Sequence, residues 1–246
     1  MSKLCRFDIL ENRQVAKDTY SIVLFGDCSS VTRPGQFVNI ALEGHYLRRP
    51  LSVCRASTES MTLVYKVVGS GTYQLSQRKP GTGLDILTGL GNGFDITESG
   101  ENPLLIGGGA GAAPLFWLAE KLIEAGIMPR AAIGFNSADE VFLAAELAQL
   151  GVPVTVSTLD GSMGARGLVT DTVGRIGLKY DYVFACGPEP MLRAVYGLSE
   201  VDGQYSFEER MACGFGACMG CSCETKYGPK RLCKEGPVLR RGEIKW

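Results

Sequence analysis

Four cysteines near the end of the chain have the spacing of ligands for an iron–sulfur cluster. Four residues separate Cys213 from Cys218, two separate Cys218 from Cys221, and Cys233 follows after eleven more. This is the plant-type pattern of a [2Fe–2S] site, with three thiolates on one tight loop and a more distant fourth. Glycines in the loop let it wrap a cluster and direct N–H groups at the sulfurs, which tunes the reduction potential. The spacing predicts that all four cysteines bind the cluster.

A structural zinc ion is the main alternative for this loop. The hook formed by Cys218 and Cys221 also suits zinc, but zinc sites usually pair two such hooks and the sequence has one. Nine cysteines cannot all pair as disulfides, and a single histidine, His45, disfavours histidine-rich metal sites. We interpret Cys223 as a bystander. The scattered cysteines are expected to be buried small apolar residues: Cys5, Cys28, Cys54 and Cys186.

A second group of residues, between two segments of β character, has the chemistry to hold a flavin. The sequence there is Arg48-Arg49-Pro50-Leu51-Ser52. The Arg49 guanidinium can bind pyrophosphate oxygens through two parallel hydrogen bonds. The Ser52 hydroxyl can hydrogen-bond a flavin ring near its reactive nitrogen. An exposed basic turn explains this motif, taken alone, equally well.

The segment 65–72 supports the flavin interpretation. It ends a predicted strand and opens a turn or a short helix over residues 71–77, which Thr72 could cap. Free N–H groups at the start of that helix would form an anion site for a phosphate. Tyr65 is expected to pack in the core rather than to stack on the flavin. The residues expected at this phosphate are Gly71 and Thr72.

A glycine-rich turn and a later Cys-Gly-Pro turn predict a dinucleotide site. Residues 107–114, GGGAGAAP, follow an apolar run and open a predicted helix, which is the context of a phosphate-binding turn. No acidic residue lies about 20 positions further on, so the turn differs from the Rossmann subtype. Both turns fall at the edge of the sheet where α/β proteins bind ligands, although each also fits a tight structural turn. The residues expected there are Gly108, Gly109, Gly111, Cys186, Gly187 and Pro188.

The residues after the second predicted strand of this region bear on which dinucleotide binds. Residues 135–140 have the sequence FNSADE and contain no arginine or lysine that could receive a 2′-phosphate. This composition favours NAD over NADP.

Three domains are needed to position these residues. Residues 1–98 contain short apolar segments separated by turn formers, which predicts an antiparallel barrel or sandwich that carries the flavin motif. Residues 99–203 alternate strands with helices, expected at 114–125, 144–150 and 168–176, which predicts a parallel sheet that binds NAD. Residues 204–246 are too short for an ordinary core, which predicts a small [2Fe–2S] domain that folds around its metal.

The composition excludes several classes of function. The net charge is −1, so the chain has no electrostatic basis for binding nucleic acid or an anionic membrane. It has no run of about 18 apolar residues that could span a bilayer, and its first residues lack the apolar core of a signal peptide. A cytoplasmic protein is therefore expected.

The order of these motifs resembles the ferredoxin reductase superfamily. The matching segments are Arg49-Pro-x-Ser52, Gly108-Gly-x-Gly-x-Ala-Pro114 and Cys186-Gly-Pro188. The tail narrows the resemblance. Glu209-Arg-Met-Ala-Cys213 with the cysteine loop, and Cys233-Lys-Glu-Gly-Pro237, are similar to the electron-transfer subunits of NAD-dependent (class 1B) dihydroorotate dehydrogenases. Leu159 stands where relatives often carry an acidic residue.

The resemblance implies FAD, a [2Fe–2S] cluster and NAD as cofactors, with the FAD held by an antiparallel β-barrel domain over residues 1–98. Carried over by position, the FAD residues are Arg49, Pro50, Leu51, Ser52, Lys66, Val67, Val68, Gly71 and Thr72. The resemblance also implies a heterotetramer with two FMN-containing catalytic subunits, in which electrons pass from FMN through the cluster and FAD to NAD⁺ during pyrimidine synthesis. The sequence contains no evident base for oxidising dihydroorotate, so no catalytic residue is assigned to this chain. Alternatives are the small subunit of a ferredoxin:NADP or sulfide dehydrogenase type oxidoreductase, a stand-alone reductase, and a nucleotide-binding module with structural zinc.

Overall fold

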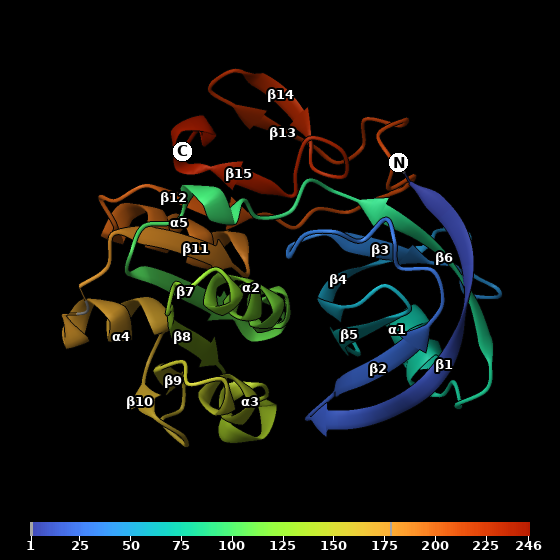
Figure 1. The fold of residues 1–246 in the computed structure, drawn as a ribbon, viewed down its shortest axis with the longest axis horizontal. Coiled ribbons are helices and arrows are strands. Elements are labelled where there is room, and N and C mark those ends of the chain that lie inside the picture. The colour runs from blue at the N-terminus through green and yellow to red at the C-terminus, as the bar shows by residue number, and fades with distance from the viewer. Residues whose placement is uncertain (1, 178) are drawn as a thin grey trace.

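The computed structural model describes residues 2–177 and 179–246 and contains a barrel and a sheet side by side (Figure 1). The barrel is closed and antiparallel, with strand order β1-β2-β5-β4-β3-β6. Its alternating apolar residues point inward, as in the buried pattern of β6. The strands are β1 (Lys3–Ala16), β2 (Thr19–Phe25), β3 (Phe37–Ile40), β4 (Arg49–Ala56), β5 (Ser60–Lys66) and β6 (Gly83–Leu90). Helix α1 (Ser70–Ser76) follows β5, and the turn η1 (Ile96–Glu98) follows the barrel.

The second body is a seven-stranded sheet with the order β10-β9-β8-β7-β11-β12-β15. All neighbouring pairs are parallel except β12 and β15. The strands are β7 (Pro103–Gly108), β8 (Arg130–Phe135), β9 (Val154–Thr158), β10 (Ala165–Arg166), β11 (Tyr182–Cys186), β12 (Gly203–Ser206) and β15 (Val238–Arg240). The helices are α2 (Ala112–Glu124), α3 (Ala144–Gln149), α4 (Val169–Ile176) and α5 (Glu189–Leu198), with short 3-10 turns η2 (Gly109–Gly111) and η3 (Ala138–Glu140).

The expected fold class is confirmed, and the predicted helices match α2, α3 and α4 to within two residues. Two local differences have clear causes. Helix α2 begins at Ala112, two residues before the predicted start at Pro114, because the turn η2 already winds the chain. The flavin motif is itself strand β4 rather than a connection between strands, since Arg49 to Ser52 pair with β3.

Helix α2 joins the two bodies. Its residues Leu115 and Leu118 belong to a buried cluster that also contains Cys54 and Val64 of the barrel. Trp117, on another face of the helix, packs with the core of the barrel and is 4% exposed. Because α2 is buried on both of these faces, it holds the glycine-rich turn before it in a fixed position next to the barrel.

The last segment of the chain contacts both bodies (Figure 1). Its hairpin consists of β13 (Ser222–Thr225) and β14 (Gly228–Arg231), and β15 then joins the large sheet before η4 (Arg241–Glu243). Sheet strands therefore lie on both sides of the predicted boundary at residues 203 and 204, and the three domain ranges remain a prediction. No helix of the part that the structure describes is long and apolar enough to cross a membrane.

Candidate cofactor and cluster sites

A cavity of about 390 Å³ opens between the barrel and the glycine-rich turn. Strands β4 and β5, helix α1, the turn η2 and the segment that follows β12 form its walls. Nine of the residues that the sequence predicts at cofactors line it: Arg49, Pro50, Leu51, Ser52, Lys66, Val68, Thr72, Gly111 and Cys186. The first seven are predicted flavin residues, and the last two belong to the predicted dinucleotide turns.

Arg49 and the start of helix α1 lie together at this cavity. A methyl group on Gly71 would lie 2.2 Å from the Arg49 Nε atom, so the guanidinium packs directly on the helix turn. The Nη2 atom of Arg49 is 2.8 Å from His45 Nδ1, which holds the side chain in place. A fixed guanidinium beside the first turn of a helix is suited to bind a phosphate.

Helix α1 begins at Ser70 rather than Gly71, because Gly69 is its N-cap. Thr72 therefore does not cap the helix from outside. Its hydroxyl lies in the first turn, where it accepts a hydrogen bond from the Val68 N–H at 3.0 Å and donates one to the Gly69 carbonyl at 3.1 Å. Val67, in contrast, packs against the barrel core and its N–H donates to the Asp18 carbonyl. It contributes to the site only through the backbone.

Tyr65 is 2% exposed and stacks on Tyr20, with the ring centroids 5.9 Å apart. Its hydroxyl donates to the Asn12 Oδ1 atom at 3.0 Å, and burial raises its pKa. Core packing, as expected from the sequence, accounts for this residue, although one side of it reaches the cavity.

One wall of the cavity was not predicted from the sequence. Phe207, Glu208, Glu209 and Met211, which precede the cysteine loop, line the side opposite the barrel strands. Burial raises the pKa of the Glu208 carboxyl. The motif Glu209-Arg-Met that carries the family resemblance was the available signal for this wall, but sequence spacing does not indicate that the segment crosses to the flavin side.

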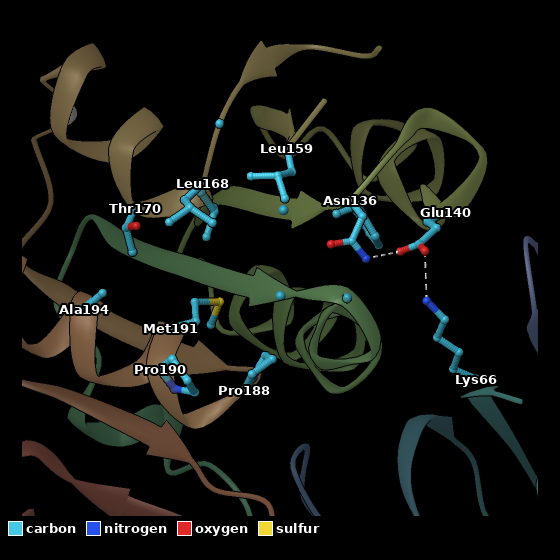
Figure 2. A pocket seen from close by; sticks show the side chains of 16 residues that line it. Lys66, Asn136, Glu140, Leu159, Leu168, Thr170, Pro188, Pro190, Met191 and Ala194 are labelled. Atoms are coloured by element: carbon cyan, nitrogen blue, oxygen red, sulfur yellow. Dashed lines mark hydrogen bonds and ion pairs between the residues drawn. The ribbon is translucent and has the colours of Figure 1, made fainter. Parts of the chain in front are cut away.

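A second cavity, of about 360 Å³, lies at the carboxyl ends of the sheet strands (Figure 2). Gly108, Gly109 and Pro188, all predicted at the dinucleotide, line it together with Met191. Gly187 lies behind them, since a methyl group there would be 3.1 Å from the Gly108 nitrogen. The location agrees with the rule that open α/β sheets bind ligands beyond the carboxyl ends of their strands.

The two predicted turns meet at a point that separates the cavities. A methyl group on Gly111 would lie 2.2 Å from the Cys186 carbonyl oxygen and 2.8 Å from the Gly187 nitrogen. Only glycine permits this approach of backbone to backbone. The sequence predicted both turns at one edge of the sheet, and the structure brings them into direct contact.

Lys66 lines both cavities and crosses from one body to the other. Its Nζ atom is 3.0 Å from Glu140 Oε1, and the second oxygen of Glu140 accepts a hydrogen bond from Asn136 Nδ2 at 2.9 Å (Figure 2). Burial raises the pKa of Glu140, but the hydrogen bonds from Lys66 and Asn136 outweigh it and the pKa is lowered overall. Lys66 is the only cation among the described residues that line the dinucleotide cavity, and Leu159 is another of its lining residues.

The four cluster cysteines come together as two pairs. Cys213 and Cys218 form one pair, and the N–H groups of Ala217 and Cys218 donate to the Cys213 sulfur at 3.3 and 3.4 Å. Cys221 and Cys233 form the other, with the Cys233 N–H donating to the Cys221 sulfur at 3.4 Å. Two pairs fit two irons that each take two thiolates, whereas one zinc ion draws all four sulfurs to a single centre.

The electrostatics of the loop suit bound thiolates. Burial raises the pKa of the Cys213 thiol, but N–H donation from Cys218 and Phe215 prevails and lowers it from 9.0 to about 6. Burial first, and the neighbouring Cys221 thiol second, raise the pKa of Cys233 to about 12. Metal binding removes the proton from such a buried thiol.

The remaining cysteines are Cys223, beside the loop, and four in the barrel and the sheet. Cys223 is on β13 opposite Lys230, and its pKa is raised by burial. Cys28, Cys54 and Cys186 are 1–2% exposed, as expected. The expectation was wrong for Cys5, which is only half-buried although it packs against the barrel core, because it lies near the start of β1.

Comparisons with known proteins agree with this arrangement. Residues 208–245 match the family model described as the iron–sulfur cluster binding domain of dihydroorotate dehydrogenase B. The chain is 38% identical to a protein of Geobacillus sp. (strain WCH70) named dihydroorotate dehydrogenase B (NAD(+)), electron transfer subunit, over 99% of both chains. A protein of the same name from Bacillus mycoides (strain KBAB4) is 39% identical over 96% of both chains.

Solved structures show the same fold. One is the structure of an NADH-dependent reduced ferredoxin-NADP oxidoreductase, with a TM-score of 0.89 and 31% identity over 98% of this chain and 90% of that one. Phthalate dioxygenase reductase has a TM-score of 0.63 and 17% identity over 79% of this chain and 64% of that one, a likeness in fold alone.

Proposed function

Because the chain belongs to the family of electron-transfer subunits of NAD-dependent dihydroorotate dehydrogenase B, we propose that it passes electrons from a catalytic subunit to NAD⁺. The route runs from the FMN of that subunit through a [2Fe–2S] cluster and FAD. When bound, the flavin supplies the exchange between single electrons and hydride, which neither the cluster nor the nicotinamide provides. The residues of this chain bind and position these groups.

The observation that carries this function is the contact between the two cavities. They are separated by the close approach of Gly111 to Cys186, and Lys66 lines both. A flavin in the first cavity and a dinucleotide in the second would therefore bind in adjoining cavities, and the nicotinamide would extend past this contact to reach the flavin ring. Hydride transfer requires such proximity of the two rings.

On the flavin side, we assign phosphate binding to Arg49 and the first turn of α1, at Gly71 and Thr72. Ser52 is placed to hydrogen-bond the ring, while Pro50, Leu51, Val68 and the aliphatic stem of Lys66 form the cavity wall. Val67 holds the strand in register through its backbone. On the other side, Gly108, Gly109, Gly187 and Pro188 would hold the dinucleotide.

The partner of this chain is a dihydroorotate dehydrogenase catalytic subunit. We propose a heterotetramer of two plus two subunits that acts in pyrimidine biosynthesis in the cytoplasm. The four thiolates of Cys213, Cys218, Cys221 and Cys233 hold the cluster through which electrons would enter. Cys218 is exposed, so a redox partner can approach the cluster from its side. NAD rather than NADP is the proposed acceptor, because Lys66, the one lining cation in the described chain, is already paired with Glu140.

Co-purification with the catalytic subunit tests this function. The complex is expected to contain FMN, FAD and two irons per copy of this chain, and to reduce NAD⁺ with dihydroorotate. Serine substitutions at Cys218 or Cys221 should abolish NAD⁺ reduction but leave dihydroorotate oxidation by an artificial acceptor intact. The matched control is Cys223→Ser, which is expected to leave NAD⁺ reduction unchanged. An iron-free chain, or variants that still reduce NAD⁺, would refute the proposal.

The second candidate is a subunit of a ferredoxin-linked NADP oxidoreductase, which the structural likeness at 31% identity favours. The partner distinguishes the two. A catalytic subunit that contains FMN and oxidises dihydroorotate supports the first function, whereas a large partner with FAD and [4Fe–4S] clusters supports the second.

A further inference from the structure

Two asparagines of the barrel contact the carboxyl-terminal segment, and they differ in how their amides are used. Asn92 follows β6 and bonds the turn before β15 with both ends of its side chain. Its Nδ2 atom donates to the carbonyls of Glu235 at 3.2 Å and Val238 at 2.7 Å, and its Oδ1 atom accepts from the Val238 N–H at 3.1 Å. This asparagine is fully satisfied by backbone groups and serves as a structural anchor.

Asn39 lies on β3 and is completely buried. Neither end of its side-chain amide has a hydrogen-bond partner among the residues that the structure describes. A buried amide without partners destabilises the folded state. Asn39 pairs across the sheet with Pro50, which lines the flavin cavity. Asn39 therefore lies beside the flavin site with an unpaired N–H₂ donor and an unpaired oxygen acceptor.

The side chain of Asn39 faces the cysteine loop. A methyl group on Gly214, the residue after Cys213, would lie 2.4 Å from Asn39 Nδ2. Gly214 also has a φ of +77°, so glycine is needed there both for the backbone conformation and for the approach of the amide. The loop that carries the cluster ligands thus rests on the amide nitrogen of a barrel residue.

The chemistry of the cluster makes it a suitable hydrogen-bond acceptor for the Asn39 amide. Two ferric ions, two sulfides and four thiolates give a net charge of about −2, and every outer atom is a sulfur that accepts hydrogen bonds. A neutral amide N–H₂ is a donor that suits such a group, and a donor stabilises the more negative reduced cluster most. Backbone groups already serve the Cys213 and Cys221 sulfurs, so a side-chain donor would add to them from the flavin side.

We infer that the side-chain amide of Asn39 donates a hydrogen bond to a sulfur of the cluster held by the Cys213 loop. It acts as a positioning residue that raises the reduction potential of the cluster and ties the loop to the barrel strand next to the flavin. This inference rests on the proposed function, because it needs the cluster to be bound at these four cysteines.

The test is Asn39→Leu in the full complex, which keeps the branching of the side chain at a somewhat larger volume and removes the donor. The ratio of reduced to oxidised cluster at a fixed potential, followed by electron paramagnetic resonance, is expected to fall about tenfold, which is about 59 mV for a one-electron carrier. The flavin midpoint in the same sample should not move. Asn92→Leu is the matched control, expected to lower thermal stability but to leave the cluster potential unchanged.

A second measurement uses the unaltered chain and does not depend on the folding of a variant. Labelling asparagine side chains with ¹⁵N should give a hyperfine coupling to the reduced cluster in the unaltered chain. Absence of this coupling, or an unchanged potential in Asn39→Leu with its full iron content, would overturn the inference. Loss of iron and of the resonance signal from the unaltered chain would instead contradict the proposed function itself.

Discussion

The flavin cavity and the dinucleotide cavity share Lys66 and the glycine-rich turn, but they are built differently. Strand residues of the barrel, held by hydrogen bonds on both sides, provide the main wall of the flavin cavity. The end of β8, the start of α4 and the loops beside them, at residues 134–136, 159 and 167–170, provide much of the dinucleotide cavity. A wall of paired strands suits a resident cofactor, whereas loops suit a ligand that must bind and leave in every turnover.

A substitution at Gly111 should impair both cavities, because this residue lies where they adjoin. The Gly111→Ala substitution sets a methyl group against the Cys186 backbone, which cannot move aside as a flexible side chain could. Such overpacking costs about 1–3 kcal/mol. Both flavin retention and affinity for NAD⁺ are expected to fall at least about tenfold, as measured by flavin fluorescence and by NAD⁺ titration. A loss of flavin retention without a loss of NAD⁺ affinity, or the reverse, would show that the two cavities are not coupled at this turn.

Arg49 should affect the flavin cavity alone. Arg49→Ala removes the guanidinium that packs on Gly71, and hydrogen bonds to charged groups contribute about 1.5–3 kcal/mol. Flavin affinity is expected to drop roughly 10- to 100-fold in reconstitution of the apoprotein, while iron content stays constant. Arg48→Ala is the control, because the Arg48 guanidinium donates to the Asp85 carbonyl instead. An equal loss of flavin affinity in both variants would show that Arg49 has no specific role in flavin binding.

Glu140 should affect the dinucleotide cavity more than the flavin. Glu140→Gln removes a negative charge from the cavity lining and releases Lys66 to attract the anionic pyrophosphate. One charge at this range is worth about 0.5–1 kcal/mol, so the KM for NAD⁺ should fall roughly two- to fivefold. Asp139→Asn is the control, since Asp139 pairs with Lys17 on the outside. A fall in flavin content instead would assign the ion pair to the flavin side.

The smallest expected effect is on stability in acid. The folded state lowers the pKa of Glu140 below its ordinary value of 4.5, so its stabilising contribution is complete above that pH and is lost as the pH falls through the lowered pKa. Because Lys66 is 35% exposed, the contribution is about 0.5 kcal/mol. Denaturant unfolding at pH 7 and pH 3.5 should show a smaller acid-induced loss in Glu140→Gln than in the unaltered chain. An equal loss of unfolding free energy in the two proteins would indicate that the ion pair of Lys66 and Glu140 does not form in solution.

Local sequence patterns determined much of this protein. The spacing of the cysteines, the glycine-rich turn and the alternation of strands and helices depend on residues close together in the chain, where backbone geometry limits the outcome. For this reason the strand–turn–helix at Gly108 and Gly111 and the flavin residues on β4 and β5 were predictable, and they line the cavities in the structure.

Tertiary structure decided how distant segments meet. The ion pair of Lys66 with Glu140, the return of β15 to the sheet, and the contact of Asn39 with Gly214 join residues separated by scores of positions. No local periodicity encodes such contacts, because they depend on how barrel, sheet and cysteine loop bury their shared cores. The sequence thus specified which chemical groups the protein has, and packing alone determined which of them face one another.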